Sequence, residues 1–187
     1  MARKKQYIEE EVIEKAMHLF WRNGYEATSV RMLEKEMGIN QFSIYSSFKN
    51  KQGVFLESIK YYKKEINSIK DTLRRSNNGI TGIKQYFYNF LDFSTEGTLC
   101  KGCLVTNSVN EIKDAADLEV MIVLKQFASE IRDLFVSNLE QDDQRATIEI
   151  EKQADFLMNS ILGLSIASKV FNKNQLENII EVTFTNL

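Results

Sequence analysis

Hydrophobic residues recur at intervals of three and four along most of this chain, which is the spacing of one face of an α-helix. The segment that ends at Gly24 has this pattern, and so do residues 80–93, 118–139, 154–171 and 174–187. We find no alternating Val/Thr-rich runs of the kind that mark β-strands. Pro is absent and only 8 Gly occur, so few residues interrupt the helical patterns. We therefore expect an all-α fold of about nine helices.

A further apolar stripe begins just after Lys51. Its members follow one another at intervals of four, three, four, three and four residues, and they are Phe55, Ile59, Tyr62, Ile66, Ile69 and Leu73. This continuous pattern predicts a single helix of about 20 residues, roughly 30 Å long. Such a helix would connect the N-terminal part of the chain to the remainder.

Residues 27–51 combine two short helical patterns with a glycine between them. Thr28 and Ser29 are suited to cap the first helix and Asn40 the second, while Gly38 supplies a left-handed turn. The apolar positions of the two helices would pack together and leave polar and aromatic side chains outside. Such a pair forms a helix-turn-helix that can enter the major groove of DNA, although the pattern also fits a generic helix pair.

Twelve positions in and before this segment share their residue types and spacing with a known pattern. The pattern is approximately L-F-x-x-x-G-Y-x-x-T-S/T, then G-V-x-x-x-x-L-Y-x-x-F-x-x-K, and the positions are Leu19, Phe20, Gly24, Tyr25, Thr28, Ser29, Gly38, Ile39, Ile44, Tyr45, Phe48 and Lys51. The chain thereby resembles the TetR family of bacterial transcriptional regulators. The resemblance implies a three-helix helix-turn-helix domain followed by a larger helical domain. One departure is Glu34, where the family usually has a small Ala. The sequence therefore does not define how the two helices contact each other at this position.

Charge is divided unevenly along the chain. The net charge is −2, but residues 1–64 hold 12 Lys or Arg and 8 Asp or Glu, whereas the remaining residues hold 12 and 18. A basic N-terminal part, with an arm at Arg3, Lys4 and Lys5, suits DNA, and an acidic remainder suits a regulatory body. We therefore expect two domains, a DNA-binding domain at 1–50 and an effector-binding and dimerisation domain at 51–187.

The sequence has no run of 18 apolar residues and no signal peptide. We therefore expect a protein of the cytoplasm with no membrane partner, and the resemblance to the TetR family implies a bacterial protein that associates with the nucleoid.

Side chains on the outer face of the predicted helix-turn-helix are candidates for DNA contact. Gln41 can pair bidentately with adenine, and Phe42 and Ser43 can touch a thymine methyl group or a base edge. Tyr45 suits either a phosphate contact or a place in the core. The predicted DNA-binding set is Thr28, Ser29, Arg31, Asn40, Gln41, Phe42, Ser43, Tyr45, Ser46, Lys49 and Lys51.

The helix predicted at 154–171 is apolar on almost every face, and a helix of this kind must be buried on all sides. A second copy of the chain can supply part of that burial, and the alternative is a core helix within a monomer. The C-terminal end is also similar to that of many TetR-family proteins, whose last two helices dimerise. A homodimer would read a palindromic operator in double-stranded DNA. The predicted dimer interface comprises Leu157, Ile161, Gly163, Leu164, Ile179 and Phe184.

The two cysteines, Cys100 and Cys103, have C-x-x-C spacing. Zinc needs four ligands, and the only histidine, His18, lies in the first helix, so we expect no metal. Residues 102–108 are similar to a run in TetR-family regulators, some of which sense electrophiles or oxidants through the cysteine that Cys103 matches. Cys103 is therefore either a small buried residue or a sensor.

Aromatic side chains of the later helices could line an apolar cavity or belong to an ordinary core. Together with the cysteine run they give the predicted effector or sensor site, which consists of Tyr86, Phe87, Phe90, Cys103, Asn107 and Phe127. No paired carboxylates, Ser/His arrangement or phosphate-binding glycine loop supports an enzyme, and no cofactor is expected. We expect a repressor that a small apolar or thiol-reactive effector releases from DNA. The alternative is a thiol-active helical redox protein that uses Cys100 and Cys103.

Overall fold

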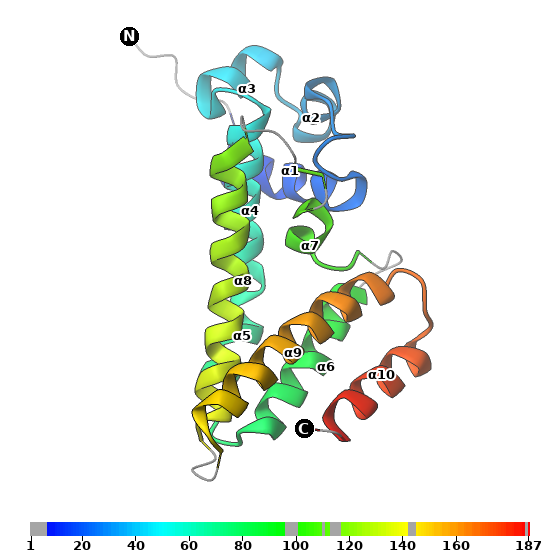
Figure 1. Ribbon diagram of the computed structural model, residues 1–187. Coiled ribbons are helices and arrows are strands. Elements are labelled where there is room, and N and C mark those ends of the chain that lie inside the picture. The colour runs from blue at the N-terminus through cyan, green and yellow to red at the C-terminus, as the bar shows by residue number, and fades with distance from the viewer. Residues whose placement is uncertain (1–6, 96–100, 110, 113–116, 142–144, 186) are drawn as a thin grey trace.

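The structure of this chain, a computed structural model, is all-helical in the part that it describes (Figure 1). That part consists of residues 7–95, 101–109, 111–112, 117–141, 145–185 and 187. Its ten helices are α1 (Glu9–Asn23), α2 (Val30–Met37), α3 (Gln41–Phe48), α4 (Lys51–Glu65), α5 (Asn67–Arg74), α6 (Ile80–Thr95), α7 (Leu104–Val109), α8 (Leu118–Leu139), α9 (Thr147–Ala167) and α10 (Lys173–Thr185). The predicted all-α fold is confirmed. None of the helices in these ranges is long and apolar enough to cross a membrane.

Helices α1 to α3 form a compact unit, which we call the reading head, at the top of the molecule as drawn in Figure 1. Local signals set its helix ends. The hydroxyl of Ser29 accepts a hydrogen bond from Met32 N–H at 3.2 Å at the start of α2, and Gly38 ends α2 in the left-handed region with φ 69°. The apolar sides of the three helices meet the first turns of α4 in one core. Its fully buried members include Ala16, Phe20, Leu33, Ile44 and Phe55.

The segment after Lys51 forms two helices, so the prediction of one continuous helix was wrong. Helix α4 ends at Glu65 and α5 begins at Asn67, with Ile66 between them at ψ −6°. The N–H of Ile69 donates to the carbonyl of Ile66 at 3.2 Å, which is a tightened 3₁₀-type turn. The apolar intervals continue through this turn, so the sequence pattern does not reveal the break.

Two lysines on either side of the break bind the same carboxylate of α8. Nζ of Lys63 in α4 lies 2.7 Å from Glu130, and Nζ of Lys70 in α5 lies 2.8 Å from it. The side chain of Lys70 is only 4% exposed, and Glu130 supplies the opposite charge that a buried ammonium group needs. The ion pairs therefore tie α4 and α5 to α8 on both sides of the break.

The remaining helices, α5 to α10, form what we call the body. Helix α8 runs alongside α4 and α5, α6 and α9 cross them obliquely, and α10 packs on the outer side of α6 and α9 (Figure 1). Aromatic contacts bind these layers together, for example Tyr86 of α6 edge-on against Phe135 of α8 with ring centroids 5.6 Å apart. The short α7 lies between the reading head and α9, in contact with α1, α4, α8 and α9.

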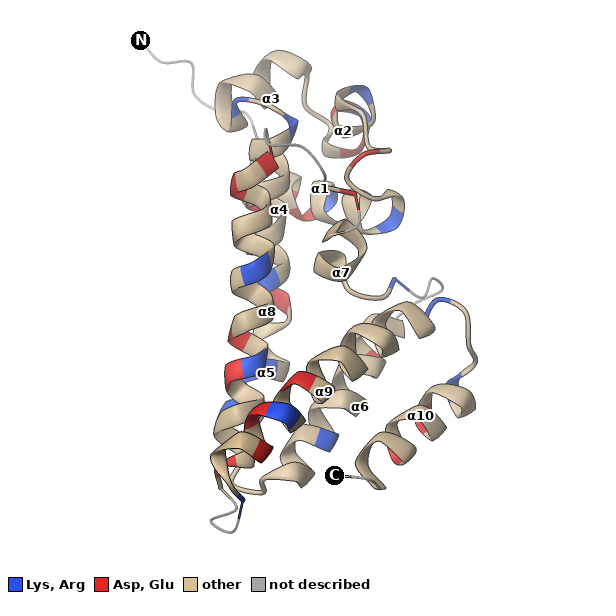
Figure 2. Ribbon diagram, in the orientation of Figure 1, with Lys and Arg blue, Asp and Glu red and all other residues tan. Residues whose placement is uncertain are grey.

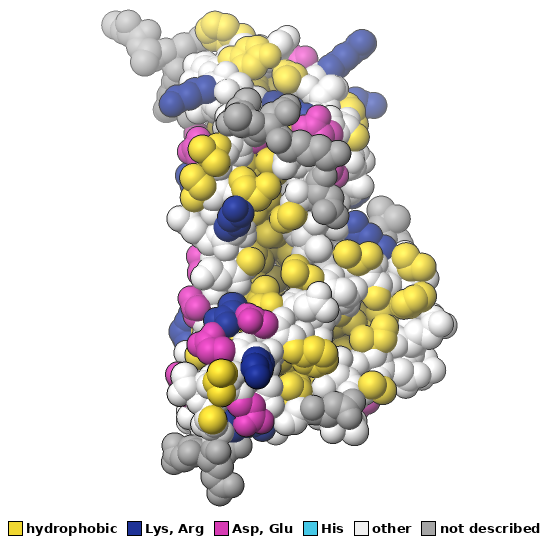
Figure 3. All heavy atoms as spheres, viewed as in Figure 1, with side chains coloured by type: hydrophobic (Ala, Val, Ile, Leu, Met, Phe, Trp, Pro, Cys, Tyr) yellow, Lys and Arg dark blue, Asp and Glu magenta, His cyan; other side chains and the backbone are white. Residues whose placement is uncertain are grey.

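Helix α9 has apolar residues on two faces, and only one face is buried within the chain. Leu157, Ile161 and Leu164 lie in the chain's own core, so their assignment to a dimer interface is corrected. Ile179 and Phe184 of α10 are partly buried, and Phe184 packs on Phe87 at 5.0 Å. The outward side carries other apolar side chains, which Figure 3 shows gathered over this part of the molecule. The exposed apolar residues of α9, α10 and the turn between them are Ile148, Phe156, Leu162, Ile166, Val170, Phe171 and Val182.

Candidate nucleic-acid interface

Helix α3 is anchored by its apolar side and presents the opposite side to the surroundings. Ile44 and Phe48 are buried in the head core. On the other side Phe42 is 77% exposed and Tyr45 43% exposed, and Gln41 beside them is also exposed. A short helix that displays an amide and two aromatic side chains has the form of a major-groove reading element.

Two side chains bind the N-terminus of α3. Asn40 caps the helix, because its Oδ1 accepts a hydrogen bond from Ser43 N–H at 2.9 Å. The carboxylate of Glu34 in α2 accepts a second hydrogen bond, from the backbone N–H of Gln41. The side chain of Gln41 is held as well, since its Nε2 donates to the hydroxyl of Tyr45 at 3.0 Å. Glu34, which the sequence left as a poor fit, therefore joins α2 to α3.

The corner between α3 and α4 requires a close backbone approach that sequence reasoning missed. Lys49 has φ 70°, and it is the one non-glycine residue with a positive φ in the described ranges. Asn50 caps α4 by accepting from Gly53 N–H at 2.8 Å. A Cβ at Gly53 would lie 3.0 Å from the carbonyl carbon of Phe48 and closer still to its oxygen. A glycine in the first turn of a predicted helix, where it lowers helix stability, was the available signal.

Basic side chains lie at the same end of the molecule as α3. Arg31 and Lys49 are exposed, and Figure 2 shows Lys and Arg on α2 and next to α3. Lys51 has a fixed position, because its Nζ lies 4.4 Å from the ring centroid of Tyr25 and donates to the carbonyl of Glu26 at 3.3 Å. The predicted basic arm at residues 3–5 lies outside the described residues.

Thr28 is a correction to the predicted DNA-binding set. Its side chain is fully buried, and its hydroxyl donates to the carbonyl of Gly24 at 2.6 Å. Thr28 therefore shapes the turn between α1 and α2 and cannot reach a phosphate. Its neighbour Ser29 is exposed at the start of α2.

The turn between α1 and α2 is held by residues of the body, in a set of contacts that we call the neck. Glu26 N–H donates to Glu111 Oε2 at 2.9 Å, and the hydroxyl of Tyr25 donates to Asp117 Oδ1 at 3.1 Å. A Cβ at Gly24 would lie 2.8 Å from Glu111 Oε2, so the turn fits closely against that carboxylate. Burial raises the pKa of Tyr25, and the hydrogen bond to Asp117 raises it further. No local sequence signal indicated these contacts, which join residues 85 and 92 positions apart.

The sequence of the reading head has a match among known families. Residues 12–58 match the sequence model of the bacterial regulatory proteins of the tetR family. These residues therefore form a DNA-binding domain of the TetR family. This is a family of transcriptional regulators that bind DNA and are not enzymes, so the alternative of a thiol-active redox enzyme is set aside.

Full-length relatives agree with this assignment. The chain is 24% identical to YezE, an uncharacterized HTH-type transcriptional regulator of Bacillus subtilis strain 168, over 100% of both chains. It is 23% identical to the HTH-type transcriptional repressor ComR of Escherichia coli strain K12, over 99% of this chain and 90% of that one. A cysteine-substituted TetR-family regulator, CifR, solved with double-strand operator DNA, has the same fold, with a TM-score of 0.88, 23% identity and 98% of each chain covered.

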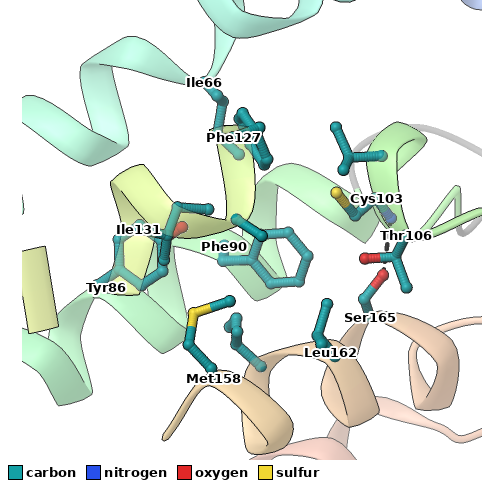
Figure 4. Close-up of a pocket in the computed structure, with 13 residues that line it drawn as sticks. Ile66, Tyr86, Phe90, Cys103, Thr106, Phe127, Ile131, Met158, Leu162 and Ser165 are labelled. Atoms are coloured by element: carbon teal, nitrogen blue, oxygen red, sulfur yellow. Dashed lines mark hydrogen bonds between the residues drawn. The ribbon is translucent and has the colours of Figure 1, made fainter. Parts of the chain in front are cut away.

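The body contains a small apolar cavity between α6, α8 and α9 (Figure 4). The space amounts to about 30 Å³, which is room for roughly one water molecule. Four of the residues predicted for an effector site line it, namely Tyr86, Phe90, Cys103 and Phe127. Ile66, at the break between α4 and α5, lines it as well.

Two other residues of the predicted effector site do not line the cavity. Phe87 faces the opposite way and packs on Phe135 and Phe184, with centroid distances of 6.0 and 5.0 Å. Asn107 donates from Nδ2 to the carbonyl of Lys101 at 2.9 Å and closes the loop before α7. Both residues are therefore structural within this fold.

Cys103 lies at the start of α7 and is buried, with 5% of its surface exposed. Its Sγ accepts a hydrogen bond from the hydroxyl of Tyr62 at 3.2 Å, and its N–H donates to Ser165 Oγ at 2.9 Å. Burial raises the pKa of Tyr62 well above its usual value, as does the neighbouring thiol. The Tyr62 ring also packs edge-on against Trp21 of α1 at 5.1 Å, so Cys103 is one residue removed from the reading head. Cys100 lies outside the described residues.

Proposed function

We propose that this protein is a homodimeric repressor that binds a near-palindromic operator with α3 of each copy. An effector that enters the cavity beside Cys103 would release the DNA. The observation that carries the proposal is the exposed side of α3, where Gln41, Phe42 and Tyr45 stand on a buried apolar base. The relatives add support, because ComR is named a repressor and CifR was solved with operator DNA.

In this proposal the reading head, within residues 1–50, supplies the DNA contacts. Gln41 reads a base edge through its amide, and Phe42 packs on a thymine methyl group. Arg31, Lys49 and Lys51 bind phosphates, which makes affinity depend steeply on salt. The other polar residues proposed for the DNA-contacting side of the reading head are Ser29, Asn40, Ser43 and Ser46.

The second copy would pack on the exposed apolar side of α9 and α10, within residues 51–187. One head makes too few contacts for a useful ratio of specific to non-specific binding. Two heads related by a two-fold axis would read half-sites about 34–36 Å apart or a multiple of that spacing. Gly163 supports this packing, because a Cβ at that position has no atom within 4 Å among the described residues, apart from its chain neighbours and the adjoining backbone of α9. An open glycine in the middle of a helix leaves space for another helix.

The effector is either a small apolar molecule or a thiol-reactive one. A cavity of about 30 Å³ is far below the roughly 300 Å³ of a typical ligand site, so any effector larger than water must open it. Opening would displace Ile66 at the α4–α5 break and Cys103 at the start of α7. Helix α7 leads directly to Glu111 in the neck, and the neck holds the turn on which Lys51 rests. Release would follow from the two heads losing their spacing.

A binding titration tests the proposal. Fluorescence anisotropy would measure the affinity of the protein for DNA from upstream of its own gene and for a shuffled duplex of equal length, at two salt concentrations. We expect specific binding that weakens steeply with salt, an at least tenfold loss in Gln41→Ala, and no change in the control Gln126→Ala, an exposed residue of α8. Equal affinity for the two duplexes would refute the proposal.

The signal is tested on the same complex. The DNA complexes of the wild type and of Cys103→Ser would be treated with N-ethylmaleimide and, separately, with small apolar acids. The release of DNA in each case separates the two kinds of effector. Release by the thiol reagent that Cys103→Ser abolishes assigns a thiol-reactive effector. Release by an apolar acid in both proteins assigns a ligand that fills the cavity.

A further inference from the structure

Glu34 is one of the positions at which this chain departs from the usual TetR-family pattern, and the structure gives its carboxylate a definite partner. The carboxylate accepts a hydrogen bond from the backbone N–H of Gln41, the first residue of α3. The first N–H groups of a helix have no partner within the helix. Asn40 binds another of these groups, at Ser43, so α2 and the turn together fix the start of α3.

The contact restricts Gln41 as well as the helix. Its backbone is held by Glu34, and its side-chain Nε2 is held by the hydroxyl of Tyr45 at 3.0 Å. A glutamine side chain loses much rotamer freedom when it is ordered, and a bidentate contact with adenine requires one orientation of the amide. Ordering the amide before DNA arrives lowers the cost of forming that contact.

The same carboxylate carries a negative charge to the place where α3 meets DNA. Helix N-termini are favourable sites for phosphate groups, because their N–H groups and dipole attract anions. Here a carboxylate of the protein is already bound to the first N–H of α3. The carboxylate therefore repels a phosphate at that position on any DNA. Its hydrogen bond to Gln41, in contrast, strengthens binding only at the base pair that Gln41 reads.

We propose that Glu34 determines specificity, by positioning Gln41 for one base pair and by weakening the binding of unrelated DNA. The inference rests on the proposed reading role of Gln41. A small Ala at this position, as the family usually has, could fulfil neither role.

Four variants separate the two effects. Glu34→Gln keeps an acceptor for the N–H of Gln41 and removes the charge, and Glu34→Ala removes both. Gln41→Ala, alone and combined with Glu34→Ala, removes the reading amide. Glu36→Gln is the matched control, since it removes a charge from the same helix at a residue paired with Arg22 at 2.8 Å.

The affinities of these proteins would be measured by anisotropy on three kinds of DNA. These are an operator selected by the wild type from random sequences, its single-base-pair variants, and an unrelated duplex. Circular dichroism melting of each variant would show that the head is folded.

We expect Glu34→Gln and Glu34→Ala to bind unrelated DNA roughly fivefold more tightly, which corresponds to about 1 kcal/mol for one charge near a phosphate. This increase in affinity for unrelated DNA should become smaller as salt rises from about 50 to 200 mM. Glu36→Gln should show a smaller increase than the Glu34 variants. Glu34→Gln should keep the wild-type discrimination at the base pair read by Gln41. Glu34→Ala should reduce the discrimination at this base pair about tenfold. The reduction should be absent when the same substitution is made in the Gln41→Ala protein.

Three results would overturn the inference. If Glu34→Ala loses discrimination equally with and without Gln41, the residue acts on the fold of α2 and α3 and does not position Gln41. If Glu34→Gln binds unrelated DNA no more tightly than the wild type, the charge has no role in selectivity. Unchanged base preferences in Gln41→Ala would refute the reading role of Gln41, and the positioning role of Glu34 with it, while salt-sensitive operator binding would still uphold the regulator itself.

Discussion

Replacement of Gly53 by alanine is the most direct test of how α3 is held on α4. A methyl group at this position would lie 3.0 Å from the carbonyl carbon of Phe48, and nearer than that to the carbonyl oxygen. Phe48 is the last residue of α3, and the atoms in the way belong to its backbone. No side-chain rotation can therefore relieve the clash, so the end of α3 or the start of α4 must move by about 1 Å.

The size of the effect follows from two opposing contributions. Forced overpacking costs about 1–3 kcal/mol, whereas alanine in place of glycine within a helix gains about 0.5–1 kcal/mol. The clash outweighs the gain, and we expect Gly53→Ala to lose roughly 1–2 kcal/mol of unfolding free energy. For a chain of this size that corresponds to a Tm lower by about 2–8 °C. A shift of about 1 Å also exceeds the tolerance of a base-edge hydrogen bond, so operator affinity should fall at least tenfold.

Calorimetry of the two proteins measures the change in Tm, and anisotropy with the selected operator measures affinity. A variant that melts within about 1 °C of the wild type and keeps its operator affinity would show that the corner tolerates a side chain. The close approach of Gly53 to Phe48 would then not hold α3 in place, and the argument for a rigid corner would fail.

The remaining predictions concern the body and the neck. Gly163→Ala adds a methyl group that has no atom of the described chain within 4 Å beyond its chain neighbours and the adjoining backbone of α9, so it should stabilise the monomer by about 0.5–1 kcal/mol. Sedimentation velocity should show weaker self-association of this variant, and undiminished association would place the dimer contact elsewhere. Glu111→Ala removes one hydrogen bond of the neck, and we expect operator affinity to fall about two- to fivefold and the response to effector to shrink. An unchanged response in anisotropy would exclude the neck as the coupling route. Burial raises the pKa of Glu130, but hydrogen bonds from Lys63 and Lys70 lower it more, so its pKa lies below the usual value. The stability from this ion pair is present above the unfolded pKa of about 4.3 and is lost as pH falls through the lower folded pKa. Urea unfolding should therefore show a loss below about pH 4.5 that Glu130→Gln lacks, and parallel pH profiles would contradict this assignment.

The reading head was predictable because its signals act over short distances along the chain. Ser29 and Asn40 cap the helices that follow them, and each bonds an N–H three residues ahead. Gly38 adopts the left-handed conformation that the sequence predicted for it. Apolar spacing then fixed which sides of α2 and α3 pack inward, since a short helix with one apolar side can be oriented in only one way.

The faces of the body could not be assigned in the same way. Helix α9 is apolar on both sides, so its pattern has no period that distinguishes the core from a partner, and Leu157 and Leu164 were assigned to the wrong side. Thr28 matched the family pattern, but its burial depends on the turn around it. The break at Ile66 keeps the apolar intervals of α4 and α5, and the lysines that tie it to Glu130 are far from that residue in the sequence.

The two attachments of the reading head differ in kind, and this difference decides where a signal can act. The corner at Gly53 is backbone packed against backbone, so it moves only if α3 itself is distorted. The neck consists of hydrogen bonds from Glu26 to Glu111 and from Tyr25 to Asp117, each worth about 0.5–1.5 kcal/mol net. A ligand shifts an equilibrium only by its difference in affinity between two states, and a tenfold preference supplies about 1.4 kcal/mol. An effector with that modest preference for the opened cavity can therefore break one neck bond, whereas the residues that line the cavity do not include Phe48 or Gly53 of the corner. Under the proposed function, release separates two intact reading heads, and Gln41 keeps its geometry in the released state.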